Sequence, residues 1–303
     1  MLHLVQFVPY FPPHVGGLES YAQGLAKAWV AQGMGKMTIA TFSPGQSTVV
    51  PEYDIDGYHV VVLPAWEIIK GFPLPKLWSP LFWRGIARLR SAVPNIVLTH
   101  TRFFATTPLG WWFARSVGCR WIHLEHGSGP VVGQGALVQM FSRLWDATLG
   151  RWALQNADAL LAASEACRTY VETTSRRTDI SVALQGIEIS PIIRATNPIP
   201  VVVFVGRLVA LKNVASLLRA AAVVANGGKN FKLRIVGDGP ERRALETLVT
   251  ELGIVDRTEF TGALSREKIL SDVLPTADVF VNPSLQEGLP TTVIRRLRLA
   301  VTW

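Results

Sequence analysis

The chain has 303 residues, of which 49% are hydrophobic and 17% charged, so it can bury two cores and carries too few charges to remain disordered. Its formal net charge of +8 divides into +3 over residues 1–190 and +5 over residues 191–303, and three cations of the second part lie in the last nine residues. A single basic face for nucleic acid is therefore not indicated. The sequence also lacks an uncharged apolar run of the ~20 residues that a membrane-spanning helix needs.

Residues 1–7 read as a buried strand, because they show neither a basic leader nor a small-residue cleavage site. The sequence thus predicts action in the cytoplasm. Cys119 and Cys167 stand in apolar surroundings without partners at metal-ligand spacing. We expect both to be core residues, and neither a disulfide framework nor a zinc site is indicated.

Short β-branched runs alternate with helical stretches along the whole chain, the pattern of parallel sheets covered by helices on both faces. Strands are expected at 2–8, 37–42, 59–63, 96–100, 120–125 and 159–163, then at 201–205, 232–236, 258–261 and 279–282. Helices are expected at 18–32, 81–91, 107–117, 138–155 and 165–174, then at 214–226, 241–252 and 265–274.

The same rhythm restarts after the polar, Pro-containing segment 190–200, which predicts a domain boundary near residue 195. We therefore expect an α/β protein of two Rossmann-like, doubly wound domains, residues 1–195 and residues 196–303. In such sheets ligands bind beyond the carboxyl ends of the strands, so the loops that follow strands are the candidate sites.

Gly16 and Gly17 follow the first predicted strand and lead into an amphipathic helix. Adjacent glycines let a backbone approach a ligand and direct helix amides at an anion, although a plain strand-to-helix turn would look the same. The segment is not G-x-G-x-x-G, which counts against a nicotinamide cofactor.

In the second half, Gly206 and Arg207 leave the first strand and Lys212 precedes the next helix. Two cations and free backbone amides could converge there on a diphosphate, although a solvated rim is the alternative. The turn that begins at Gly237 is mainly architectural, because its proline opens the next helix. Glu287 follows the last predicted strand, where a carboxylate could bind sugar hydroxyls.

The ordered set of loops resembles one known family. Its members are Phe11-Pro12-Pro13-x-x-Gly16-Gly17-x-Glu19, Gly206-Arg207-Leu208-x-x-x-Lys212-Asn213, Gly237-Asp238-Gly239-Pro240, Phe260-x-Gly262, Ala277-Asp278 and Pro283-Ser284-x-x-Glu287-Gly288-Leu289-Pro290. In this order they resemble the retaining group 1 glycosyltransferases, which are family 4-like and have the GT-B fold. The match runs through nearly all the chain.

The resemblance implies transfer of a sugar from a UDP- or GDP-sugar to a glycan or lipid-linked acceptor, with retention at the anomeric carbon and no metal or other cofactor. It implies that Arg207 and Lys212 stabilise the departing diphosphate. It also implies that Glu287 contacts the donor sugar while the amides of Gly288 and Leu289 assist at the phosphates.

By the same resemblance, Gly16, Gly17, Gly206 and Gly237 belong to the donor-binding loops. His126, in Glu-His-Gly-Ser after a strand of the first half, matches the histidine of the family that lies near the reacting sugar. Taken alone, a histidine in a Gly-rich turn is more often a structural residue than a ligand-binding one.

One position departs from the family pattern, which has a second glutamate eight residues after Glu287, where this chain has Arg295. A frameshift after Ile294 would explain the basic tail. We therefore expect a truncated second domain and a chain that is weakly active or inactive. Asp54 and Asp56 have the spacing of a metal motif, but they precede a strand, so a metal site is not favoured.

Residues 66–90 combine Trp66, Trp78 and Trp83 with five cations against one acid. Aromatic and basic residues together suit peripheral contact with an anionic membrane, and a helix packing its Trp side chains into the core is the alternative. The leading function is a cytoplasmic glycosyltransferase of polysaccharide or lipopolysaccharide biosynthesis. A nucleotide-sugar 2-epimerase and a non-catalytic fragment are the alternatives.

Overall fold

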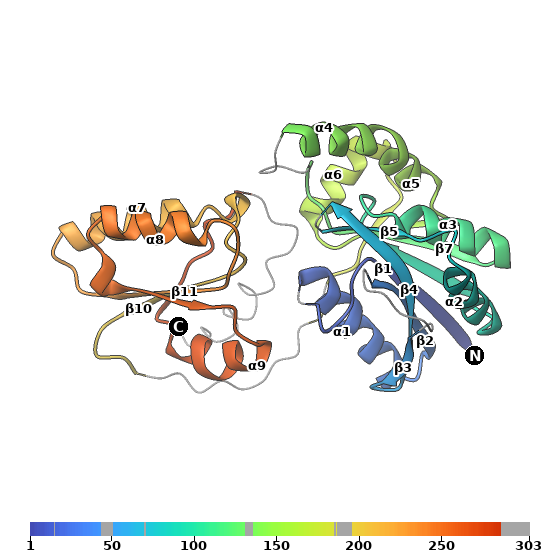
Figure 1. Cartoon of the computed structure of the whole chain (residues 1–303), viewed down its shortest axis with the longest axis horizontal. Helices are drawn as coiled ribbons and strands as arrows, with labels where there is room; N and C mark the ends of the chain where they lie inside the picture. The colour runs from blue at the N-terminus through green and yellow to red at the C-terminus, as the bar shows by residue number, and fades with distance from the viewer. Residues whose placement is uncertain are drawn as a thin grey trace. The chain divides into compact units, whose positions relative to one another are not determined.

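The computed structural model describes residues 1–14, 16–43, 51–69, 71–130, 136–184, 186 and 196–285. The chain divides into two compact units, Met1–Gly186 and Ile187–Trp303 (Figure 1). The boundary expected near residue 195 falls at the end of residues 187–195, which lie outside the described residues. The segment with Glu287 and Arg295 also lies outside them. The truncation that the sequence suggests therefore stays a prediction.

The first unit is built on a sheet of nine strands in the order β3-β4-β2-β1-β6-β7-β8-β9, with β5 paired to β4. The pairs β3–β4 and β4–β5 are antiparallel and the remaining pairs are parallel. The strands are β1 Leu2–Val8, β2 Gly35–Ser43, β3 Glu52–Ile55, β4 Tyr58–Ile69, β5 Phe72–Pro75, β6 Ile96–His100, β7 Arg120–Glu125, β8 Ala159–Ala162 and β9 Ile180–Val182.

Helices cover both faces of this sheet because side chains alternate along each strand. Leu4 and Val8 of β1 pack towards α1 and α6, whereas Val5 and Phe7 pack towards α2 and α3. The helices are α1 Gly17–Ala31, α2 Pro80–Ser91, α3 Thr106–Val117, α4 Ala136–Trp145, α5 Arg151–Asn156 and α6 Glu165–Ser175 (Figure 1).

The second unit has a parallel four-stranded sheet in the order β12-β11-β10-β13. Phe204 and Leu233 pack towards α7 and α8, and Val203 and Val236 towards the segment around Val273. The elements are β10 Val201–Val205, α7 Val214–Asn226, β11 Lys232–Val236, α8 Arg242–Glu251, β12 Thr258–Gly262, α9 Arg266–Lys268 and β13 Val279–Phe280. Two doubly wound, Rossmann-like units are thereby confirmed.

The structure differs from the sequence-based expectation in the long helix 138–155. A π-helical turn, Asp146–Gly150, separates α4 from α5 there. The expected helix 265–274 is likewise broken into α9, a π-helical turn at Ile269–Val273 and a 3₁₀ turn at Leu274–Thr276. Within the described residues, no helix has both the length and the apolar character that crossing a membrane requires.

Candidate functional site

The strand order of the first unit reverses at β1. The chain runs from β1 to β2 on one side and later returns to β6 on the other. A crevice forms beyond the carboxyl ends of the strands at such a switch point, and ligands bind there in open α/β sheets. The loop after β1, the end of β6 at His100 and the turn after β7 at His126 all belong to this edge.

The loop after β1 folds around the buried carboxylate of Glu19. Its Oε1 lies 2.7 Å from Nδ1 of His14, and the His14 ring stacks on Tyr10 with centroids 4.3 Å apart. A Cβ on Gly16 would overlap with this carboxylate, whereas one on Gly17 would meet nothing within 4 Å. Gly16 therefore leaves the room that the Glu19 carboxylate occupies, and Gly17 leaves open space at the start of α1.

The turn after β7 is held by Glu125, which is fully buried. Its Oε1 accepts hydrogen bonds from the backbone N–H groups of His126 at 2.9 Å and Gly127 at 2.7 Å. Its Oε2 lies 3.2 Å from Nη1 of Arg102, whose backbone N–H also donates to it at 3.1 Å. The carboxylate thereby fixes the backbone on which His126 stands.

Arg102 carries this network to the π-helical turn after α4. Its Nε and Nη2 donate to the two carboxylate oxygens of Asp146 at 3.0 and 3.1 Å, and Nη2 also donates to the hydroxyl of Tyr170 at 3.0 Å. Burial alone would raise the pKa of Glu125, but the charge of Arg102 and hydrogen bonds from its neighbours lower that pKa well below its usual range. Glu125 is therefore ionised at neutral pH.

His126 is the first of three side chains that run from the edge of the sheet into its core. Its Nε2 lies 3.0 Å from Nδ1 of His100, and Nε2 of His100 lies 2.9 Å from Oε1 of Gln6. The His126 ring also meets the Tyr21 ring edge-on, with centroids 4.8 Å apart. The backbone carbonyl of His126 accepts a hydrogen bond from the thiol of Cys167 at 3.2 Å. Burial lowers the pKa of His126 to about 4, against the opposing charge of Glu125.

In the second unit, glycines pack the loops after β10 and β11 and the last residue of β12 backbone against backbone. Gly237 has a φ of +138°, and a Cβ on it would overlap with the carbonyl of Gly206. Its N–H donates to the carbonyl of Gly262 at 2.8 Å, and a Cβ on Gly239 would overlap with the backbone of Leu208. The sequence-based reading of this turn as architectural agrees with these contacts.

Arg207 is exposed directly after Gly206, at the carboxyl end of β10. Lys212 closes a 3₁₀ turn, Ala210–Lys212, and Asn213, with a φ of +49°, caps α7. Both predicted cations thus stand on the short segment between β10 and α7. The structure places them at the edge where a doubly wound sheet binds its ligands.

The loop after β13 comes to the same segment, because β13 pairs with β10. The backbone N–H of Leu285 donates to the carbonyl of Leu211 at 2.9 Å, and the hydroxyl of Ser284 donates to Oδ1 of Asn282 at 2.7 Å. Leu285 therefore lies beside the residue that precedes Lys212. Glu287, Gly288 and Leu289 lie outside the described residues.

Four residues of the first unit were missed by the sequence reading: Gln6, His100, Arg102 and Glu125. Each is buried, and each is polar within or next to an apolar strand. A polar residue in a run such as Leu-His-Leu-Val-Gln-Phe-Val is costly to bury without a partner, and this was the signal that could have identified Gln6.

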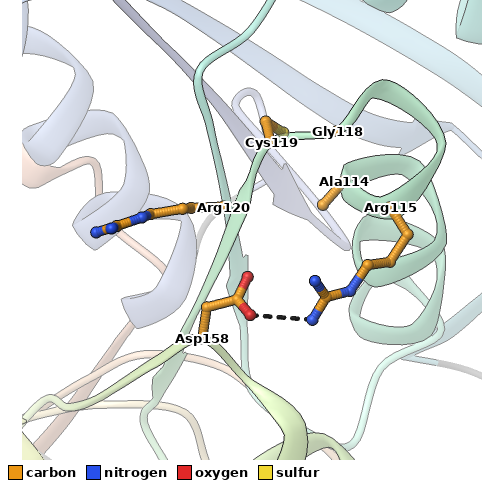
Figure 2. Close-up of a pocket in the computed structure, with 6 residues that line it drawn as sticks. All are labelled: Ala114, Arg115, Gly118, Cys119, Arg120 and Asp158. Carbon is orange, nitrogen blue, oxygen red and sulfur yellow. Dashed lines mark hydrogen bonds and ion pairs between the residues drawn. The ribbon is translucent and has the colours of Figure 1, made fainter.

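Figure 2 shows a pocket at the opposite, amino-terminal edge of the same sheet. Arg115 of α3 donates to Oδ1 of Asp158 at 2.9 Å (Figure 2). Oδ2 of Asp158 accepts from the backbone N–H of Trp121 at 2.8 Å. Asp158 thereby links α3 to β7. None of the residues predicted to bind a ligand lines this pocket.

Both units match known families. Residues 16–182 match the family described as "Glycosyl transferase 4-like domain", and residues 188–297 match "Glycosyl transferases group 1". An uncharacterized glycosyltransferase of Methanocaldococcus jannaschii is 29% identical over 306 residues, covering 95% of this chain and 76% of that protein. The lipopolysaccharide core biosynthesis glycosyltransferase LpsD of Rhizobium meliloti is 47% identical over 103 residues, 33% of this chain and 28% of its own.

Solved structures show the same fold. Sucrose-phosphate synthase from Thermosynechococcus elongatus aligns with a TM-score of 0.79 at 20% identity, over 99% of this chain and 79% of its own. Anabaena HepE in complex with UDP and glucose aligns with a TM-score of 0.70 at 15% identity, over the same shares of the two chains. The chain belongs to the glycosyltransferases that combine a 4-like domain with a group 1 domain, and it has the GT-B fold.

Proposed function

We propose that this chain transfers a sugar from a UDP- or GDP-sugar to a glycan or lipid-linked acceptor, with retention at the anomeric carbon. The observation that carries the proposal is the hydrogen bond between Leu285 and Leu211. It brings the segment that leads to Glu287 beside the cationic segment between β10 and α7. Two loops far apart in the sequence thus meet at one edge of the second sheet.

In this proposal Arg207 and Lys212 stabilise the charge that develops on the diphosphate as its bond to the sugar breaks. Fixed cations next to backbone amides do this work well because they need no reorganisation during the reaction. The packed glycines at 206 and 237 keep side chains away from the site that a diphosphate would occupy. We expect transfer to continue in the presence of a chelator.

The first unit would supply the surroundings of the reacting sugar. Gly16 and Gly17 begin α1, whose amino-terminal amides favour an anion, and His126 stands at the switch point of the sheet. Glu287 would bind sugar hydroxyls, assisted at the phosphates by the amides of Gly288 and Leu289. Retention stays part of the proposal and is tested by the anomeric configuration of the product.

Nucleotide binding by the double variant Arg207→Ala/Lys212→Ala tests this function. Isothermal titration with UDP and GDP should show affinity at least about tenfold weaker than in the unchanged chain, since each charge-assisted contact contributes more than 1 kcal/mol. Arg219→Ala/Lys229→Ala is the matched control, because both of its side chains are exposed on or next to α7. Equal affinity in the two double variants would refute the assignment.

We further propose contact with an anionic membrane through the aromatic–basic surface, defined as Trp66, Ile68, Lys76, Trp78, Trp83 and Arg84. The exposed fractions of Ile68 and Trp78 are 73% and 65%. Trp66 and Trp78 contact each other with centroids 4.2 Å apart, and the Lys76 ammonium lies 6.0 Å from the Trp66 ring. The alternative was a helix that packs its Trp side chains into the core. On α2 the core position is taken by Phe82, which is fully buried, whereas Trp83 next to it is 47% exposed.

Helix α4 adds apolar side chains to this region. Phe141 meets Phe72 at the start of β5 with centroids 6.0 Å apart, while Met140 and Leu144 on the same helix are 64% and 63% exposed. Exposed apolar side chains flanked by cations suit the interface of an anionic bilayer. Such contact, at the cytoplasmic face of a membrane, would give access to a lipid-linked acceptor in the synthesis of a surface glycan.

A further inference from the structure

The hydrogen bonds around His100 determine which nitrogen of His126 carries a proton. A neutral imidazole has one N–H donor and one acceptor nitrogen, so each neighbour of a histidine constrains the other side of the ring. His100 is fully buried, and burial lowers its pKa well below the usual range. It is therefore neutral at neutral pH.

The chain of donors starts at the side-chain amide of Gln6, which is also fully buried. Its Nε2 donates to the carbonyl of Ala22 at 3.3 Å and lies 3.3 Å from the sulfur of Met37. A carbonyl needs a donor, so this end of the amide is the NH₂ group. Oε1 of Gln6 then faces Nε2 of His100 at 2.9 Å and accepts a hydrogen bond from its N–H.

The next step follows from the single proton of a neutral ring. His100 carries its proton on Nε2, so its Nδ1 is an acceptor, and Nε2 of His126 at 3.0 Å must be the donor. A neutral His126 then has a lone pair on Nδ1. No described residue forms a hydrogen bond with that nitrogen, whereas the rest of the three-residue chain is satisfied.

We propose that Gln6 and His100 are positioning residues that fix the proton of His126 on Nε2, so that Nδ1 accepts a hydrogen bond from a hydroxyl of the donor sugar and disfavours a carboxylate there. The proposal rests on the role of His126 beside the reacting sugar given above. A lone pair facing a hydroxyl makes a hydrogen bond, whereas a lone pair facing a carboxylate leaves two acceptors together. The donor class is thus a neutral hexose rather than a uronic acid.

Charged groups around His126 do not change this assignment. Glu125 would favour a proton on His126, but its Oε1 already accepts from the backbone N–H groups of His126 and Gly127. His123 and His100 on the neighbouring strands oppose an additional positive charge. Tyr21 of α1 and Cys167 of α6 complete the surroundings, and the described contacts of both with His126 leave Nδ1 unoccupied.

The first experiment reads the tautomer directly and needs no donor. Long-range ¹H–¹⁵N spectra of the full chain, with ¹⁵N-labelled histidine, distinguish the two neutral forms, and His126→Gln assigns the signals among the six histidines. We expect the Nε2–H form for His126 near neutral pH. An Nδ1–H form, or an imidazolium, would overturn the proposal whatever the activity of the chain.

A second variant reverses the direction of the hydrogen bond between His100 and His126. In Gln6→Glu a buried carboxylate faces Nε2 of His100 and holds that ring as an imidazolium, whose Nδ1–H then donates to His126. His126 must accept on Nε2 and carry its proton on Nδ1. Gln155→Glu on α5 is the matched control, and it should keep the spectrum of the unchanged chain. If Gln6→Glu does not fold, Gln6→Met is the second variant. It should give a mixture of the two neutral forms of His126 or broaden the ¹H–¹⁵N signals of that ring.

Donor binding then tests the sugar preference. UDP-glucose should bind the unchanged chain at least about tenfold more tightly than UDP-glucuronate, and Gln6→Glu should reduce this ratio by about tenfold. Equal binding of the two donors together with the Nε2–H form would overturn the selection of a hydroxyl. If neither donor binds although the Nε2–H form is present, the proposed function fails while the positioning of His126 stands.

Discussion

Gly237 lies against Gly206 so closely that the carbonyl of Gly206 occupies the position that a Cβ of residue 237 would take. This contact joins the loops after β10 and β11, and the hydrogen bond from the N–H of Gly237 to the carbonyl of Gly262 adds the end of β12. Backbone packing thereby fixes the start of the segment that carries Arg207 and Lys212.

Gly237→Ala should lower the free energy of unfolding of the second unit by about 2–4 kcal/mol, because it adds a steric overlap to a φ of +138°. Gly228→Ala is the control, since its φ is +75° and a Cβ would meet nothing within 4 Å. That change should cost about 1 kcal/mol. Urea midpoints of the two variants measure the difference, and equal midpoints would contradict the packing argument.

Glu125→Gln should destabilise the first unit by about 3–5 kcal/mol, because Arg102 would keep a buried charge with only Asp146 to balance it. Glu172→Gln breaks a half-exposed pair with Arg168 and should cost less than about 1 kcal/mol. Chemical unfolding followed by tryptophan fluorescence compares the two. A loss at Glu125 no larger than that at Glu172 would show that the network does not hold the turn after β7.

The stability of the first unit should fall on acidification. Burial lowers the pKa of His126 to about 4, whereas an unfolded histidine titrates near about 6.5. Between these values the unfolded chain binds more protons than the folded chain, so the free energy of unfolding decreases as the pH falls, by at most about 1.4 kcal/mol per pH unit for each such histidine. His126→Gln should reduce this slope in urea titrations at about pH 7 and about pH 5. An unchanged slope would show that His126 titrates alike in both states.

Trp78→Ser should weaken binding to phosphatidylglycerol vesicles by about tenfold, because it removes a large side chain that would enter the bilayer interface. Val223→Ser is the control: Val223 is 72% exposed on α7, in the other unit. Vesicle flotation at low and high salt measures both, and binding of the unchanged chain should fall with salt. Equal flotation with neutral phosphatidylcholine vesicles would count against an anionic surface as the partner.

Much of the fold could be predicted from the sequence because the central strands are apolar runs with clear ends. β1, β6, β7, β10 and β11 have the expected bounds. β3 was missed because it has only four residues and all of its side chains are exposed, and β5 because its Phe-Pro-Leu-Pro sequence reads as a turn. The π-helical turn at 146–150 was missed because an i to i+5 repeat changes little in the hydrophobic pattern.

The candidate site was predictable only where a motif is local. The loops at Gly16 and Gly206 are contiguous segments, so their residue order identifies them. The pairing of Arg102 with Glu125 and Asp146 joins positions 23 and 44 residues apart. Gln6 and His100 are 94 residues apart. Gln6 and His100 come together only because β1 pairs with β6 in one particular register, and that register cannot be read from the sequence.

The pairing of β13 with β10 also affects how the second unit is made. Among the described strands of that unit, β10 is the first to leave the ribosome and its neighbour β13 is the last. Translation must therefore pass every helix and strand between them before Leu285 can reach Leu211. Until then one edge of β10 is open to other chains. A nascent second unit therefore depends on continued elongation, or on a chaperone, to protect that edge.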